Sequence, residues 1–267
     1  MKRIAKSLIS ALLLFSLALA FVSCEQTPEK LLEKAEKKLE NAPYTVEISY
    51  DYSCNDKIME QALGAMEDMD IVVQVSGEDL KMDMDFSMST MGVTISTNVD
   101  YVAVDGILYA SAHASAMGQS QVTKQKATIP PEEMGGLTND LAGTGDITFS
   151  DFETVEMVET EDGYKITCSG ISEDALAVLT ESTKDQMSGV ASNVKISFGN
   201  IKLFYEVEDG KIDTMVLSCT YTMNISGTAY QIDMRIEMDY DYDQPVSISA
   251  PADADKYTEV TYSDMMG

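Results

Sequence analysis

Cys24 is the residue whose position in this chain predicts a specific chemistry. It follows a basic start, made by Lys2, Arg3 and Lys6, and an apolar run over residues 8–22. That run is too short to span a bilayer comfortably. A basic start, a short apolar segment and small residues before a cleavage site are typical of a secretory signal. We therefore predict that residues 1–23 are a signal peptide and that the mature protein lies outside the cytoplasm.

The four residues that end this segment, Phe21-Val22-Ser23-Cys24, resemble the lipobox of bacterial lipoproteins, although the family usually has Leu where this chain has Phe21. The resemblance implies a covalent diacylglycerol at Cys24, with fatty acyl chains such as palmitate, and anchoring to a bacterial cell membrane. Residues 24–27 then form a short tether. The alternative is an ordinary secretory signal with an incidental cysteine.

Three further cysteines, Cys54, Cys168 and Cys219, fall in phase with apolar neighbours. An odd number leaves at least one thiol unpaired, and a buried free cysteine packs as a small hydrophobe. We expect three reduced core thiols, with one disulfide among them as the alternative.

The remaining candidates for chemistry are His113 and the alternating Asp239, Asp241 and Asp243. A lone histidine cannot form a multi-histidine metal site. The aspartates are separated by tyrosines and lack the glycine and glutamate of a calcium loop, so they indicate a strand. No phosphate-binding, hydrolase or zinc-protease motif is present. We therefore predict no catalytic residue, no metal and no cofactor, and a protein that is not an enzyme.

The charge balance excludes one class of partner. The 267 residues contain 45 acidic and 18 basic residues, and three of the basic ones lie in the predicted signal. The mature chain thus has 15 basic against 45 acidic residues, a net charge of −30. Binding of nucleic acid requires clustered Lys and Arg, so we predict no nucleic-acid partner. The same excess would repel a broad face of the protein from anionic headgroups.

Alternation of apolar and polar residues predicts β-strands along most of the chain. The clearest segments are 44–54, 80–88, 93–101, 164–168, 201–207, 215–225 and 230–242. Asp-Gly pairs at 105–106, 162–163 and 209–210 join such runs and favour tight hairpins, because both central residues need positive φ. The pattern predicts a largely meandering antiparallel sheet with one solvated face and one covered face.

Helices are the elements expected to cover the apolar face. Thr27 and Pro28 predict the start of a helix that runs to about Glu40. Ser172 predicts the cap of a second, which runs to about residue 188, and a third is expected near 56–66. Between residues 111 and 145 the alternation ends and Gly and Pro accumulate. We predict a flexible excursion there, with a lid over an opening as the alternative.

The whole layout resembles a large group of bacterial lipoproteins related to the LolA/LolB carriers and the LppX/LprG-type lipoproteins. The resemblance covers about 28–257 and includes Ser-Gly-Ile-Ser at 169–172 and the segments 240–248 and 250–254. It implies an α+β fold in which helices pack on the apolar concave face of a curved, unclosed antiparallel β-sheet, or half-barrel. We predict one such domain over 28–257 and a C-terminal tail over 258–267.

The group has an apolar cavity between sheet and helices, and several members carry acylated molecules. Methionine is flexible and polarizable, which suits an adaptable apolar surface. The residues we predict to line the cavity are Met82, Met84, Phe86, Met88, Met215, Leu217, Tyr221, Met223, Met234 and Met238. For any one of them, an ordinary core position is the alternative and the simpler explanation.

Two functions follow as hypotheses. The first is a non-enzymatic, membrane-anchored extracytoplasmic lipoprotein that binds a lipid or another apolar or acylated ligand in the half-barrel. The alternative is an interaction or scaffold lipoprotein of the cell envelope, with a packed core, a protein partner and no small-molecule ligand.

Overall fold

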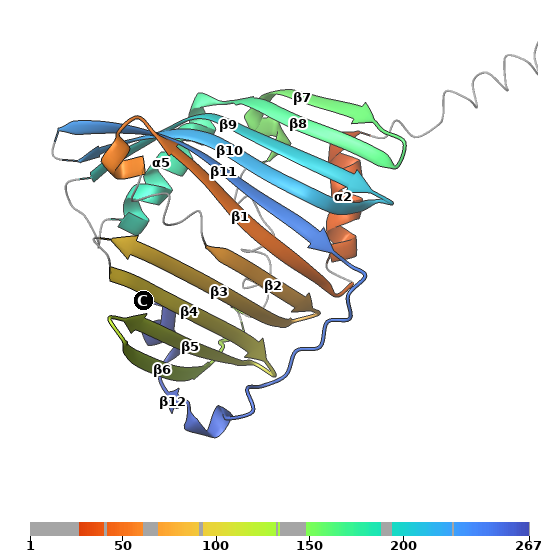
Figure 1. Ribbon diagram of the computed structural model, residues 1–267. Helices are drawn as coiled ribbons and strands as arrows, with labels where there is room; N and C mark the ends of the chain where they lie inside the picture. The colour runs from red at the N-terminus through yellow and green to blue at the C-terminus, as the bar shows by residue number, and fades with distance from the viewer. Residues whose placement is uncertain are drawn as a thin grey trace, which may run out of the picture.

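The structure is a computed structural model that describes residues 27–39, 42–60, 69–90, 93–131, 133, 148–187, 194–225 and 227–266. The predicted signal peptide, Cys24 and most of the predicted tether lie outside the described residues. The described part is dominated by one sheet of twelve strands (Figure 1).

The strands follow one another along the chain in two meanders. The first contains β1 (Tyr44–Cys54), β2 (Asp70–Ser76), β3 (Asp79–Thr90), β4 (Val93–Val104), β5 (Ile107–Ala116) and β6 (Gln119–Thr128). The second contains β7 (Phe152–Glu159), β8 (Gly163–Ile171), β9 (Val194–Glu208), β10 (Lys211–Ile225) and β11 (Thr228–Asp241). They join where β11 pairs with β1, and a short β12 (Thr258–Glu259) completes the order β12-β6-β5-β4-β3-β2-β1-β11-β10-β9-β8-β7.

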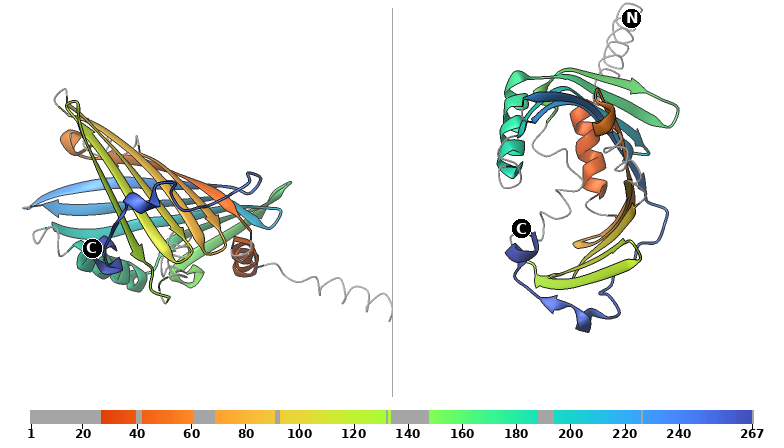
Figure 2. Two further views of the ribbon diagram at one scale, coloured as in Figure 1. Left: turned by 90° about the horizontal axis from the view of Figure 1, so that it is seen from below. Right: turned by 60° about the vertical axis from the view of Figure 1, so that its left-hand side comes forward.

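Every pairing is antiparallel except that of β12 with β6. The strands bend round in an arc that does not close, with β7 at one edge and β6 and β12 at the other (Figure 2). The prediction of a curved, unclosed antiparallel sheet is therefore confirmed.

Two of the three predicted Asp-Gly hairpins have the expected backbone. Asp105 and Gly106 have φ of 52° and 74°, and the pair at 209–210 has 49° and 69°. The pair at 162–163 joins β7 to β8, but the prediction of a positive-φ turn there is wrong. A Cβ on Gly163 would lie 1.9 Å from the Val207 carbonyl oxygen, so this glycine permits close strand approach instead.

Helix α2 (Pro28–Leu39) begins where the sequence predicts, and the Lys30 amide donates to Thr27 Oγ1 at 3.4 Å. Its buried face consists of Leu31, Leu32, Ala35 and Leu39, which belong to the main hydrophobic cluster. Helix α2 also contacts β10. The amphipathic spacing of these four residues thus attaches the helix to the sheet.

The predicted helix capped by Ser172 is confirmed. It is α5 (Glu173–Met187), and the Ala175 amide donates to Ser172 Oγ at 3.2 Å. It contacts β9. Of the helix expected near 56–66, residues 57–60 are helical and the rest lie outside the described residues. The part of the chain that the structure describes also contains a short helix, α6 (Tyr262–Met266), and two 3₁₀ turns, η1 (Phe149–Asp151) and η2 (Ala254–Lys256).

The prediction of a flexible excursion over 111–145 is wrong as far as residue 128. That part is the second half of β5, a turn at Met117-Gly118 and the whole of β6. In this half of β5 Ala alternates with Ser and His, and β6 is polar except for Val122 and Ala127, so the apolar signal is weak. Backbone pairing with β4 supplies the order. Residues 132 and 134–147 lie outside the described residues.

The predicted C-terminal tail is also part of the fold. Residues 258–259 form β12 beside β6, and a second small cluster joins Val102, Val104 and Tyr109 of the sheet to Tyr257. Lys124 Nζ lies 2.6 Å from Asp253 Oδ2. This segment is short and polar, which is why its sequence carries no strong structural pattern.

Thr45 offers a test of the packing on β1. It is 7% exposed, and its Oγ1 has no hydrogen-bond partner. Burying an unpaired hydroxyl is costly, so Thr45→Val should raise the free energy of unfolding by about 1 kcal/mol. Thr45→Ser keeps the hydroxyl and should not stabilise. Urea unfolding of both variants measures the difference, and equal stability of Val and Ser variants would contradict the prediction.

Candidate ligand-binding face

One face of the sheet, which we call the apolar face, carries uninterrupted rows of apolar side chains across the strands. The register places one residue of each strand from β5 to β7 in a single row, because directly paired residues project to the same side. The row reads Ala112, Val99, Met84, Ile71, Ile48, Met238, Met215, Tyr205, Ile166 and Met157. Apart from the Tyr205 hydroxyl, the side chains of this row offer a ligand no hydrogen-bonding group.

The burial of the apolar face changes along the strands. Leu80 on β3 is 3% exposed, and its neighbours Ala103 and Leu108 are equally buried. Further along the same strand Met82, Met84 and Phe86 are only half-buried. The face is therefore filled at one end of β3, β4 and β5 and partly open toward the other.

The ten predicted lining residues lie on β3, β10 and β11. Met84 and Met238 share the row described above, which places the two groups on one face with β2 and β1 between them. Met215 is 3% exposed and is a core residue. The side chain of Met88 lies outside the described residues. The other described candidates are half-buried, and their contact with a ligand stays a prediction.

Sequence analysis did not include four further residues of the apolar face, one on β1 between these two groups and three on β4 and β5 beyond β3. Tyr50 of β1, Tyr101 and Val99 of β4, and Ala112 of β5 lie on the same face and are half-buried. Their alternation with polar residues was the available signal.

Three tyrosines show that the apolar face is poorly solvated beside β1. Tyr50 and Tyr52 stack with ring centroids 6.2 Å apart, and Tyr221 lies on β10. Burial raises the pKa of each phenol, that of Tyr52 to about 12. Neutral, partly exposed rings of this kind can contact alkyl chains while their hydroxyl groups remain hydrated.

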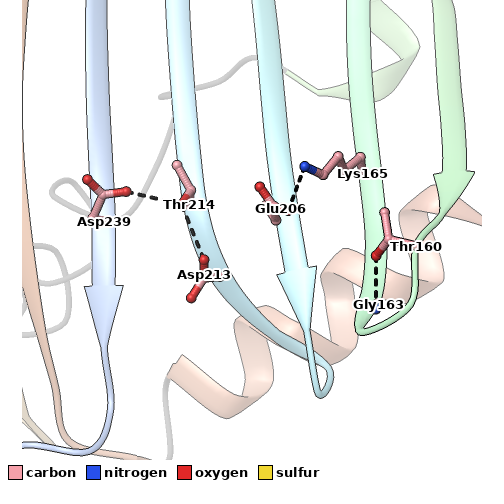
Figure 3. Close-up of polar contacts among 7 residues, drawn as sticks. All are labelled: Thr160, Gly163, Lys165, Glu206, Asp213, Thr214 and Asp239. Atoms are coloured by element: carbon pink, nitrogen blue, oxygen red, sulfur yellow. Dashed lines mark hydrogen bonds and ion pairs between the residues drawn. The ribbon is translucent and has the colours of Figure 1, made fainter.

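The opposite face is polar, and several of its few basic residues pair with acidic neighbours. Lys165 lies 2.8 Å from Glu206, and Thr214 Oγ1 donates to Asp239 at 3.0 Å (Figure 3). Arg235 pairs with Glu237. Such exposed pairs contribute little to stability, so we assign this face to solubility. Asp239 and Asp241 lie in β11, as their alternation predicted.

An open groove of about 650 Å³ crosses the polar face over β1, β11, β10 and β9. Its lining consists mainly of polar-face residues, and it also includes Tyr52, Cys219 and the predicted cavity residue Met234. The groove lies beside a register shift between Ser218 and Thr220, where β10 and β9 are locally irregular. Its mixed charges and lack of an enclosed apolar wall make it unsuitable for an alkyl ligand.

The described residues hold no group of three or more His, Cys, Asp or Glu that could bind a metal ion. His113 is exposed on β5.

Asp100 lies directly opposite Asp83 on the polar face, and burial, together with that carboxylate, raises the pKa of Asp100. Lys81 is 2.7 Å from Asp83 and partly compensates the pair. Absence of an enzyme activity stays a prediction.

Cys54, Cys168 and Cys219 are free in the structure. Burial raises the pKa of Cys168 and of Cys219 to about 11, with smaller contributions from Glu29 and Asp233 respectively. Cys54 is half-buried.

Because the thiolate is the reactive form, we expect Cys54 to react first with a thiol reagent at pH 8, and Cys168 and Cys219 only after unfolding. At that pH a thiol of pKa 11 is ionised in only about one molecule in a thousand. Cys54→Ser should abolish the fast phase. A fast phase that persists in this variant would show that a buried thiol is accessible.

No helix among the described residues has both the length and the hydropathy needed to cross a membrane.

No protein-family model and no curated protein sequence matches the chain. Two solved structures are similar in part. One is a tesB protein of Mycobacterium avium subs paratuberculosis, with 11% identity, coverage of 79% of this chain and 83% of that chain, and a TM-score of 0.15. The other is the 12:0-ACP thioesterase of Umbellularia californica, with 10% identity, coverage of 77% and 78%, and a TM-score of 0.13.

Proposed function

We propose that the protein is a membrane-anchored extracytoplasmic lipoprotein, not an enzyme, that binds an apolar or acylated ligand on the apolar face of its half-barrel. The observation that carries the proposal is the row from Ala112 to Met157, which is apolar throughout yet only half-buried at Met84, Val99 and Met238. A monomer rarely leaves a contiguous apolar surface partly exposed unless that surface binds something.

The proposal includes helices on the concave, apolar face. The buried residues of α2 share one cluster with Val46 and Val73 of that face, and Leu176 and Leu179 of α5 pack against the same cluster. Leu176 and Leu179 are only half-buried, and Val178 between them is 60% exposed. In this proposal α5 covers its part of the face less completely than α2, because its apolar residues are more exposed.

Burial of alkyl chains supplies the binding energy in this proposal. Each Å² of apolar surface removed from water contributes roughly 25 cal/mol. Binding by contact with Met and Tyr side chains requires no fixed hydrogen-bond geometry, so the site selects for apolar length and width. Specificity for a headgroup would need polar residues beside the end of the bound alkyl chain.

The experiment is mass spectrometry of organic extracts from the chain that begins at Glu25, purified without detergent from its native host. This chain contains every helix and strand of the structure. We expect one lipid class at about one molecule per protein. Met84→Asp places a carboxylate on the apolar face and should lower the bound lipid about tenfold. Ser87→Asp, on the polar face of the same strand, is the matched control. Extracts that equal a blank would overturn the proposal.

The alternative, a scaffold with a protein partner, has one observation in its favour. Strand β7 forms an edge of the described sheet, and Val158 on it is 60% exposed. An edge strand offers free backbone groups for strand addition. The edge is short and carries Glu153, Glu156 and Glu159, which discourage pairing between copies. If the organic extract equals a blank and a protein partner binds along the β7 edge, the scaffold function is favoured.

A further inference from the structure

The open groove on the polar face crosses β1, β11, β10 and β9, which are neighbours in the sheet (Figure 1). Its volume of about 650 Å³ lies within the range of small-molecule sites, about 300 to 1,000 Å³. The register places two rows of paired residues along it. One row is Asp51, Arg235, Ser218 and Lys202, and the other is Ser53, Asp233, Thr220 and Gly199. Ser218 thus lies between two long side chains, which leaves a depression over β10.

A β-bulge shapes the β9 side of the groove. The register of β9 and β10 shifts between Ser218 and Thr220. Two residues of β9, Asn200 and Ile201, thus lie opposite one residue of β10, Cys219. Asn200 has a φ of 51°, the left-handed conformation that one class of bulge uses and that asparagine tolerates. Ile201 stays in the core while Asn200 lines the groove, and bulges commonly re-aim side chains in this way beside functional sites.

Gly199, which precedes the bulge, is not required by the fold. Its φ lies outside the left-handed region, and a Cβ there would meet, beyond its chain neighbours, only the Thr220 carbonyl oxygen of the described residues, at 3.9 Å. A glycine inside a strand weakens it. Because Gly199 pairs with Thr220 and precedes Asn200, both of which line the groove, a side chain at this position would enter it. A glycine of this kind often marks the close approach of a ligand.

The charges that line the groove balance, although acidic residues outnumber basic ones 45 to 18 in the whole chain. Asp51 and Asp233 are matched by Lys202 and Arg235. The other hollow over this face, of about 360 Å³ on β3, β4 and β5, is lined by two aspartates and by no Lys or Arg. The groove over β10 therefore selects neither a strongly anionic nor a strongly cationic ligand.

Several polar groups of the groove are available to a ligand. The side chains of Ser53, Asn200, Ser218 and Lys202 make no hydrogen bond or ion pair with any other described residue. They comprise two hydroxyls, an amide and an ammonium group, and the neighbouring carboxylates add acceptors. A sugar hydroxyl both donates and accepts hydrogen bonds, so a ligand that carries many hydroxyls matches this mixture of donors and acceptors.

We propose that this groove binds a short, uncharged saccharide. Lys202 and Asn200 donate hydrogen bonds to the sugar, Asp233 accepts them from its hydroxyls, and the absent side chain of Gly199 leaves room for a ring. An extended peptide suits the site less well, because its backbone groups find partners at the edge of a sheet and not on its face. The groove lies opposite the apolar face, so this inference does not rest on the proposed function.

The experiment is binding of the chain from Glu25, labelled at its C-terminus, to an array of oligosaccharides. The array carries neutral members built from glucose, galactose, mannose and N-acetylglucosamine, and acidic members with carboxylates or sulfates. We expect binding to neutral members. Gly199→Ala should raise the urea midpoint of unfolding, because alanine loses less freedom on folding, yet lower the affinity about tenfold by filling the groove. Lys202→Ala should also weaken binding, whereas Lys126→Ala, on β6 of the same face, should not.

If the parent chain binds no neutral member, or if Gly199→Ala binds as tightly as the parent, the saccharide site is overturned. Binding to acidic members alone, with loss in Lys202→Ala, would also overturn it and identify an anion site instead. Equal losses in Lys126→Ala and Lys202→Ala would place the contact outside the groove. Binding of an apolar dye tests the proposed function separately. It should be the same in Gly199→Ala and the parent chain, so failure of one site is distinguished from failure of the other.

Discussion

Replacement of Cys24 with serine should move the protein from the membrane fraction to the soluble fraction. Each buried methylene of an acyl chain contributes about 0.8 kcal/mol. A dozen of them therefore contribute roughly 10 kcal/mol, or about seven orders of magnitude in partitioning. Fractionation of bacterial cells that express the full chain measures the effect. Labelled palmitate should enter the parent protein and not Cys24→Ser.

Cys54→Ser is the matched control, because it also removes one thiol but leaves the predicted lipidation site intact. It should remain in the membrane fraction and retain the label. If Cys24→Ser stays in the membrane fraction without the label, the anchor is something other than this lipid. Equal labelling of the two variants would contradict the assignment of the modified residue.

The sequence was sufficient to predict those strands in which large apolar residues alternate with charged ones. In β11 the alternation of Ile232, Met234, Ile236 and Met238 with charged residues fixes both the strand and its apolar face. It also predicted the N-cap at Ser172, because a hydroxyl before a helical segment has one obvious partner. These signals are local, so they need no knowledge of the fold.

Strand pairings that depend on distant parts of the chain could not be predicted from local sequence patterns. The pairing of β1 with β11 joins residues such as Ile48 and Met238, and no local pattern specifies it. The second half of β5 was missed because Ala112 and Ala114 give a weak hydrophobic contrast, and its order depends on pairing with β4. Pairing of β12 with β6 was missed for the same reason.

The sequence predicted on which side of each strand the candidate site lies, but not how deeply each of its residues is buried. Alternation placed Met84 and Met215 on the apolar side of their strands, but the structure buries Met215 and leaves Met84 half-buried. The difference arises from neighbours on other strands and from α2, which contacts β10. A one-dimensional pattern therefore identifies candidates for ligand contact without separating them from core residues.

Two alanines of the apolar face can separate a ligand site from a packed core. Ala103 is 2% exposed and pairs with Leu80 and Leu108, whereas Ala112 is half-buried and pairs with Val99. Ala103→Phe should lower the free energy of unfolding by about 1 to 3 kcal/mol, because extra volume in a packed core forces strain.

Ala112→Phe should change the free energy of unfolding by less than about 0.5 kcal/mol, as expected of a partly open position. It should nevertheless lower the affinity for an apolar dye about tenfold, because the new ring occupies the space of the ligand. Urea unfolding and dye titration of both variants measure the two effects. If Ala112→Phe destabilises the protein as much as Ala103→Phe does, that part of the face is already filled by the chain's own side chains. The scaffold hypothesis would then replace the carrier hypothesis.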